Sequence, residues 1–372
     1  QSVFSTSEGY FLFDGTRYPT GINTPSLINP NLTWEKSTTK NLGFDFTFLQ
    51  SRLTFTADIF ERKVTDILIP GGKDYPALIG DDDLPFENAG ILKTTGFELQ
   101  AKWSDKLANG FRYSVGVALS DDKAKVVSYP SNPTNKIGDG VLYKGYTVGD
   151  IWGYVTGGIL QEGDFDGVGA NGKPLYHGPY FKGGQAYPGY IWYQDLDHDG
   201  VITTGLNTVD DPGDRKVIGN NAPRYRYNIT ANFQYKGFDL DLMFQGVGKR
   251  DYWLSSTSSY WGNGAGSWEI YNNSWTPERT DAKFPMYGSG TGSYAQTGYL
   301  LDASYIKLKQ VILGYTFPRA LINKIGLEKL RLNLAAYNLF TISDMPKYYD
   351  ADYLSDAYPP KRTFSVGIQV GF

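Results

Sequence analysis

The chain has 372 residues, a formal net charge of −4 and no cysteine. Without cysteine, disulfides and cysteine-based metal or redox centres are excluded, and two histidines supply little for histidine-centred catalysis. The net negative charge provides no basic surface for nucleic acid, so no nucleic-acid partner is expected. Aromatic residues make up 16% of the chain and glycine is abundant, a mixture that favours strands over helices. No run of about 18 apolar residues exists, which excludes a transmembrane helix but not a membrane-spanning strand.

From Asn41 onward, apolar and polar residues alternate in segments of roughly ten residues, the length that a tilted strand needs to cross a bilayer. In the first segment, Leu42, Phe44 and Phe46 share one face, and Asp45 lies on the other. Nine such strands are predicted, at or within residues 41–49, 52–59, 97–103, 112–120, 225–235, 238–245, 304–317, 329–341 and 362–372. The last is the most regular, and it ends in an aromatic residue.

The connections between these strands alternate between short and long, which is typical of outer-membrane barrels with short periplasmic turns and long extracellular loops. The short links are 50–51, 104–110, 236–237 and 318–328, and the long ones are about 70–92, 128–223, 250–303 and 342–361. We therefore expect an all-β chain in the outer membrane. Residues 1–40 form an extracellular loop in this scheme, and residues 41–372 form strands joined by extracellular loops, the largest at about 128–223.

A soluble β-sandwich is the structural alternative, because one face of its strands is also apolar. Loop alternation, strands of ten or more residues and the terminal aromatic residue favour the barrel. Nine strands leave open edges, which cannot exist in lipid, so we expect an N-terminal part outside this chain to complete the wall. No signal peptide begins at Gln1, and the chain is expected to start within a longer protein.

A short acidic motif lies in the longest predicted loop. Asp195, Asp197 and Asp199 precede a glycine in the pattern D-x-D-x-D-G. Carboxylates in this spacing wrap Ca²⁺, and Val201 offers a backbone carbonyl. The twelve-residue calcium loop ends in a glutamate ligand at position twelve, but that position is a leucine here. Asp214 is therefore the candidate distant ligand, with the Asp-Asp pair before it as substitutes. Calcium is expected rather than magnesium, which keeps its waters. The alternative is a solvated acidic turn.

The loop between residues 252 and 275 is rich in aromatic rings among small polar residues. Such faces suit contact with a sugar, a peptide or a lid protein, although a long loop also packs on itself through such rings. The candidate contact residues are Trp253, Trp261, Trp268 and Trp275. Several charged residues fall on the polar face of the strands and are expected to line the lumen or to contact a plug: Asp45, Asp58, Glu98, Arg226 and Asp241.

Several phrases together resemble the C-terminal barrel region of the SusC/RagA-type TonB-dependent transporters of Bacteroidetes. Among them are "ENAGILKTTGFELQAKW", "YQDLDHDGVI", "DRKVIGNNAPRYRYNITANFQYKGFDLDLMFQG" and "YPPKRTFSVGIQVGF". The resemblance extends from about Leu32 to Phe372. It implies a barrel of about 22 strands with a plugged lumen, and the plug domain is not in this chain.

The resemblance also implies a function and partners. These are active import of an oligosaccharide or peptide, powered by TonB through the missing N-terminal part, and a SusD-like surface lipoprotein that captures the substrate. The acidic loop matches the calcium-like loop of the family at Asp195, Asp197, Asp199 and Asp214. Phe372, a terminal aromatic on an amphipathic strand, resembles the signal read by the barrel-assembly machinery, and it also suits contact with membrane lipid.

Three other functions remain open from the residues alone. A passive porin would have no plug upstream of this chain. A surface adhesin would use calcium-stiffened loops, but it does not need lipid-type alternation. A secreted glycoside hydrolase would need paired carboxylates placed for acid–base work, whereas the acidic pairs here lie in loops where solvation suits turns or cation binding. We therefore expect no enzymatic activity.

Overall fold

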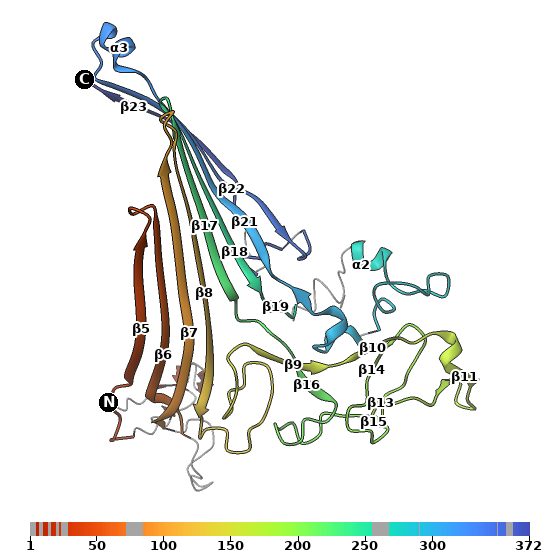
Figure 1. Ribbon diagram of the computed structural model, residues 1–372. Helices are drawn as coiled ribbons and strands as arrows, with labels where there is room; N and C mark the ends of the chain where they lie inside the picture. The colour runs from red at the N-terminus through yellow and green to blue at the C-terminus, as the bar shows by residue number, and fades with distance from the viewer. Residues whose placement is uncertain are drawn as a thin grey trace.

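The computed structural model describes residues 29–71, 85–254, 268–289, 291–347, 349–354 and 360–372, and the backbone of four short strands before residue 24. Its main feature is one antiparallel sheet of nine long strands (Figure 1). These strands are β5 (Lys36–Phe48), β6 (Leu53–Pro70), β7 (Phe86–Lys106), β8 (Arg112–Ser128), β17 (Arg224–Tyr235), β18 (Phe238–Lys249), β21 (Tyr305–Thr316), β22 (Lys329–Ser343) and β23 (Thr363–Gly371).

Every strand of the sheet pairs with its neighbours in chain order, from β5 at one edge to β23 at the other. The nine predicted strands are thus confirmed, and most are longer than their alternating segments indicated. β5 begins at Lys36 rather than Asn41, so its first residues fall inside the stretch expected to be a loop. The reason is its pairing with β6, which continues to Lys36 opposite Thr65 although the alternation has ended.

Short and long connections lie at opposite ends of the sheet (Figure 1). The turns β5–β6, β7–β8 and β17–β18 share one end with the C-terminus, as does the link that contains α3 (Arg319–Ile322) and a 3-10 helix (Asn323–Ile325). The long connections extend from the other end. This is the arrangement that the loop lengths predicted.

The apolar face of the strands is exposed. Phe44 in β5 is 51% exposed, and Phe364, Val366 and Ile368 in β23 are 71%, 77% and 67% exposed. A β-sandwich would bury this face against a second sheet, and the described part of the chain contains no such second layer over it. The exposed apolar face is the surface that a membrane barrel turns to lipid.

Aromatic rings gather near the short-turn end of this sheet. Phe111 stacks on Tyr113 and Phe233, with ring centroids 5.9 and 6.2 Å apart. Phe238 and Tyr315, which pair across β18 and β21, lie 4.4 Å apart. Aromatic residues concentrate where a barrel leaves the hydrocarbon layer, because their rings suit the lipid–water boundary. The cluster therefore indicates the height at which the sheet meets the membrane surface.

The buried apolar clusters of the described residues are built mainly from the long connections. One contains Val126, Ile137, Tyr143 and Tyr146. A second joins Val247 and Tyr305 at the strand ends to residues from two long connections. Since lipid covers the outer face of the sheet, the hydrophobic driving force for compact packing acts on the loops instead.

The long connections contain short elements of their own. The one between β8 and β17 has β9 (Asp150–Tyr154), β10 (Thr156–Ile159), a 3-10 helix (Glu162–Asp164), β11 (Phe165–Val168), β12 (Pro174–Tyr176), β13 (Tyr180–Phe181), β14 (Ile191–Tyr193), β15 (Val201–Ile202) and β16 (Arg215–Asn220). The one between β18 and β21 has β19 (Asp251–Tyr252), α2 (Trp268–Asn272), 3-10 helices at Thr291–Ser293 and Thr297–Tyr299, and β20 (Leu301–Asp302).

The N-terminal stretch has four short strands outside the large sheet: β1 (Ser5–Thr6), β2 (Tyr10–Phe13), β3 (Thr16–Pro19) and β4 (Ile22–Asn23). They form two small antiparallel pairs, β1 with β4 and β2 with β3. None of the helices in the described residues is long and apolar enough to cross a membrane.

A bulge interrupts the alternation in the middle of β21. Met243 and Phe244 of β18 pair with Gln310 and Leu308, so Lys309 is an extra residue on β21. On the other side of β21, residues 338 and 339 of β22 face this same position. A bulge shifts the register by one residue and increases the local twist. In a regular strand, residues 305 and 307 would face away from residues 310 and 312. Because of the bulge, all four residues lie on the polar face.

The two faces of β23 can be tested separately in the full-length protein. Val366 lies on the apolar face, and Ser365 lies on the other, opposite Ala335. A charged residue on the lipid face costs about 2–4 kcal/mol at the bilayer midplane, so Val366→Arg is expected to lower stability by about that amount. Ser365→Arg is expected to stay within about 0.5 kcal/mol. Urea unfolding in lipid vesicles measures both, and equal losses would contradict the assignment of the faces.

Candidate functional site

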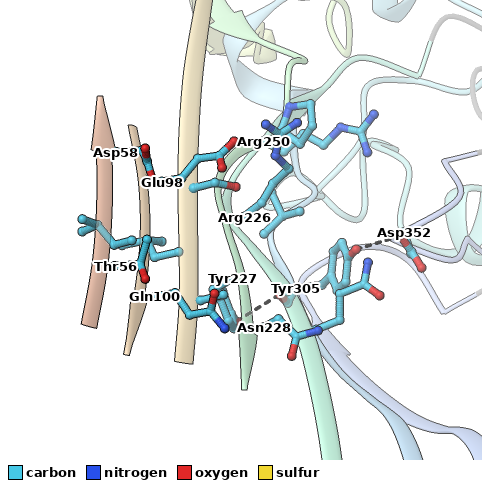
Figure 2. Close-up of a pocket in the computed structure, with 18 residues that line it drawn as sticks. Thr56, Asp58, Glu98, Gln100, Arg226, Tyr227, Asn228, Arg250, Tyr305 and Asp352 are labelled. Atoms are coloured by element: carbon cyan, nitrogen blue, oxygen red, sulfur yellow. Dashed lines mark hydrogen bonds between the residues drawn. The ribbon is translucent and has the colours of Figure 1, made fainter. Parts of the chain in front are cut away.

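The polar face of the sheet contains a concave pocket of about 620 Å³ near the long-loop end (Figure 2). Side chains from β6, β7, β8, β17, β18 and β21 line it, together with Arg250 and Asp352 from two of the long connections. Its polar groups are those the alternation had assigned to the lumen side, among them Asp58, Glu98 and Arg226. The pocket therefore belongs to the inner wall of the barrel.

Strand register places these groups in two rows that cross the sheet. In the first row, Asp58 pairs with Glu98, followed by Ser120, Arg226 and Val247 on the next strands. The second row lies one step closer to the short turns. It contains Thr56, Gln100, Ala118, Asn228, Gln245 and Lys307. A row of amide side chains thus runs beside a row that begins with two carboxylates.

A network of ions closes one side of the pocket. Lys307 is 1% exposed, and its Nζ lies 2.9 Å from Asp350 Oδ1 and 3.3 Å from Asp352 Oδ2. Tyr305 donates its hydroxyl to Asp352 Oδ1 at 2.7 Å, and Lys309 Nζ lies 3.3 Å from Asp352 Oδ2. A buried ammonium needs such partners because desolvating a charge is costly. The bulge at Lys309 brings both lysines within reach of Asp352.

These contacts hold the connection after β22 against the inner wall. Met345, Tyr349 and Ala351 of this connection pack with Val247 and Tyr305 in one buried cluster. Burial of the Asp352 carboxylate acts to raise its pKa, but the hydroxyl of Tyr305 and the ammonium groups of Lys307 and Lys309 outweigh this and lower it. The carboxylate therefore stays ionised, and its charge keeps the connection at the pocket.

The two longest connections are joined to each other by buried hydrogen bonds. Gln296 is fully buried, and its side-chain amide donates to the hydroxyl of Tyr193 at 3.0 Å. Trp275 is 3% exposed, and its Nε1 donates to Gln161 Oε1 at 2.9 Å. Backbone bonds run from Tyr154 N to the carbonyl of residue 295 and from residue 286 to residue 189. The connections thus form one packed body beyond the strand ends.

The acidic motif lies in this body, beside its aromatic core. Asp195, Asp197 and Asp214 each offer a carboxylate oxygen, and these atoms lie within 4.8 Å of one another. Asp214 is fully buried, and it accepts hydrogen bonds from the backbone N–H of Leu196 at 2.8 Å and Thr203 at 2.7 Å. The folded chain thus brings the expected distant residue to the motif, although Asp214 lies eighteen positions after Leu196 in the chain.

The local geometry suits a hard cation. Asp195 accepts N–H bonds from residues 198 and 200 through its two oxygens. Loss of water acts to raise the pKa of Asp195, but these N–H groups outweigh it and lower that pKa. Loss of water and the nearby charges of Asp214 and Asp199 raise the pKa of Asp197. Clustered carboxylates that repel each other in this way are stabilised by a cation such as Ca²⁺. Asp199 lies outside the group of three, where it accepts the N–H of Val201.

The four predicted aromatic contact residues have different positions. Trp268 is 77% exposed on α2, where its ring meets Tyr271 edge-on at 5.8 Å, and Trp253 is partly buried. Trp261 lies outside the described residues. Trp275 is buried inside the loops, so its position fits self-packing of the loop rather than contact with a ligand or a lid protein.

The remaining predicted residues lie where the strand faces place them. Phe372 follows β23 at the short-turn end and is 88% exposed. Arg226 forms an ion pair with Asp122, whereas Asp45 accepts the hydroxyl of Thr56 at 2.7 Å. Sequence analysis missed Lys307, Asp350 and Asp352. The one available signal was a lysine at position 307 among apolar neighbours, but its partners lie more than forty residues away.

The fold and the pocket together define the wall of an outer-membrane β-barrel whose polar inner face lines a lumen. Comparison with known families agrees. The model of the family described as "TonB dependent receptor-like, beta-barrel" matches residues 4–339, and the chain belongs to this family.

Curated relatives match almost the whole chain. It is 28% identical to TonB-dependent receptor P3 of Formosa agariphila over 96% of its length, and 26% identical to TonB-dependent receptor SusC of Bacteroides thetaiotaomicron over 100%. It spans about 36% and 35% of these two proteins. A structure of the RagAB peptide importer in its "open-open" state has the same fold, with a TM-score of 0.73 at 21% identity over 100% of this chain and 38% of that one. The resemblance to SusC/RagA-type receptors is thereby confirmed.

The ion network predicts how the connection after β22 responds to pH. Because the folded state lowers the pKa of Asp352, its contacts contribute stability above the ordinary value of 3.8, and this is lost as the pH falls through the lowered value. Hydrogen exchange of residues 349–354, corrected for intrinsic rates, should therefore stay slow from pH 7 to pH 5.

Asp352→Asn should accelerate this exchange at pH 7 by about tenfold, as expected for a charge-assisted bond worth about 1.5 kcal/mol. Asp302→Asn is the matched control, since the one side-chain bond of Asp302 within the described residues is to the local backbone N–H of residue 304. Protection that disappears between pH 6 and pH 5 in the unaltered protein would contradict the role given to Asp352.

Proposed function

We propose that the protein containing this chain is an active importer of the outer membrane, which takes up an oligosaccharide or a peptide with energy supplied through TonB. The observation that carries the proposal is the polar pocket in the inner wall beneath a packed body of long loops. A lumen wall with a formed pocket suits transient binding of a polar solute on its way through the barrel. Membership in the TonB-dependent receptor family supports the energy source.

A SusD-like surface lipoprotein is the proposed partner on the extracellular side. The packed loops offer an exposed ring there, Trp268 on α2, beside Tyr271, which is 56% exposed. Tryptophan and tyrosine are enriched in protein interfaces and on sugar-binding surfaces, so this pair is proposed to contact the lipoprotein or the substrate. Phe372 is proposed to be read by the barrel-assembly machinery before it contacts membrane lipid.

Import predicts a growth phenotype in the source organism. Deletion of the gene should abolish growth on one oligosaccharide or peptide source as sole nutrient, and removal of TonB should have the same effect. Complementation with the unaltered gene is the control. Unchanged growth on every tested nutrient would contradict import, and uptake that persists without TonB would favour a passive porin instead. Surface binding of the nutrient without uptake would favour an adhesin.

We also propose that Asp195, Asp197 and Asp214 hold Ca²⁺, with the carbonyl of Val201 and with Asp199 as further oxygen donors. Such a cation would supply positive charge to a loop whose carboxylates otherwise repel one another. The group lies next to the cluster of Tyr154, Ile191, Tyr193 and Ile202, so the proposed role is to stiffen the long loops rather than to take part in chemistry.

Calcium binding can be measured on the purified full-length protein by isothermal titration. Asp214→Asn is expected to weaken binding by tenfold or more, because it removes a buried charge from the group. Asp166→Asn, an exposed loop aspartate paired with His177, is the matched control. Chelation should also lower the melting temperature of the unaltered protein but not that of the Asp214 variant. No heat of binding at millimolar calcium would overturn the proposal.

A further inference from the structure

Two carboxylates stand side by side on the inner wall. Asp58 of β6 and Glu98 of β7 are direct cross-strand partners, which places their Cβ atoms about 5 Å apart. Asp58 accepts one hydrogen bond, from the side-chain amide of Asn41 at 3.1 Å. Neither carboxylate has an ion-pair partner within the described residues. Like charges placed directly opposite each other destabilise a sheet unless something neutralises them.

The opposite side of the pocket offers a guanidinium group. Arg250 follows β18, and its Nε donates to the carbonyl of Asn221 at 2.9 Å. Arg250 forms no ion pair within the part of the chain that the structure describes. The other charges of the pocket are matched, Arg226 by Asp122 and Asp352 by Lys307 and Lys309. The pocket charges that form no ion pair with the described residues are therefore two carboxylates at one side and, at the other, the Arg250 guanidinium, on which the charge of Asp352 also acts.

Uncharged hydrogen-bonding groups lie beside these charges, one step closer to the short turns. Gln100, Asn228 and Gln245 come from β7, β17 and β18 and belong to the same row across the sheet. Figure 2 labels the first two. An amide side chain both donates and accepts, so it can pair with the N–H and C=O groups of an extended backbone. Such a row, together with the charged groups of the pocket, suits a peptide, which has N–H and C=O groups between two charged ends.

We propose that this pocket binds a short peptide with free ends, its ammonium group at Asp58 and Glu98 and its carboxylate at Arg250. The inference rests on the proposed import function and narrows its substrate to peptides. Three strand spacings separate β7 from β18, about 14 Å in all. An extended peptide spans about 3.5 Å per residue, so the pocket matches a peptide of about four residues.

The experiment uses the full-length protein in detergent and measures binding by isothermal titration. The probes are one tetrapeptide of glycine and alanine with free ends, its N-acetylated form, its C-amidated form, and a neutral oligosaccharide of similar length. Removing a charged hydrogen bond costs about tenfold in affinity. Each blocked peptide should therefore bind about tenfold more weakly than the free one, and the oligosaccharide should bind more weakly still.

Two variants assign the ends of the peptide. Asp58→Asn with Glu98→Gln should weaken the free peptide about tenfold and abolish its advantage over the N-acetylated form. Arg250→Gln should abolish only the advantage over the C-amidated form. Asp241→Asn is the matched control, because Asp241 lies on the same face outside the pocket and accepts a hydrogen bond from Asn232, which also lies outside it.

Several results would overturn the proposal. One is equal affinity for free and blocked peptides, and another is discrimination that survives both variants. Tighter binding of the oligosaccharide would also overturn it. If the carboxylates instead pair with another part of the full-length protein, the double variant should lower the melting temperature while the preference for free ends stays. Growth tests separate the failures: a nutrient phenotype without peptide discrimination leaves import standing and removes only the peptide assignment.

Discussion

The requirement that every backbone polar group in a bilayer be paired within the protein governs this molecule. It forces long, continuous strands, and it leaves one face of the sheet to lipid and the other to the lumen. Phe364 and Val366 are therefore exposed in the isolated chain, while Asp58, Glu98 and Arg226 lie together on the inner side. An exposed apolar face of this kind would be out of place in a soluble protein. Here it is the surface that contacts the membrane.

The same constraint moves the buried core away from the sheet. Tyr193, Gln296 and Trp275 are buried in the connections beyond the strand ends, where water is present and apolar burial stabilises compact packing. Because these connections contact each other and the inner wall, they form a rim rather than separate loops. The acidic group around Asp214 lies inside that rim, so a bound cation would act on the shape of the extracellular mouth.

Charge is distributed unevenly along the inner wall. Some ionised groups there pair across the sheet, such as Arg331 of β22 with Asp239 of β18, whose Nη2–Oδ2 contact of 2.7 Å passes over Gly314 of the strand between them. A side chain at residue 314 would meet both groups, since its Cβ would lie 2.3 Å from Arg331. Within the pocket, Asp58, Glu98 and Arg250 form no ion pair with the described residues, so their charges are the ones open to a ligand.

The sequence by itself determined which residues face lipid, how many long strands the sheet has and which ends carry the long loops. Period-two alternation and loop length are local properties, so they need no knowledge of distant residues. Only the tertiary structure decided the rows across the sheet, the bulge at Lys309, the partners of Lys307 and the burial of Trp275. Register and loop packing depend on contacts between residues far apart in the chain, and a one-residue shift between strands changes every partner.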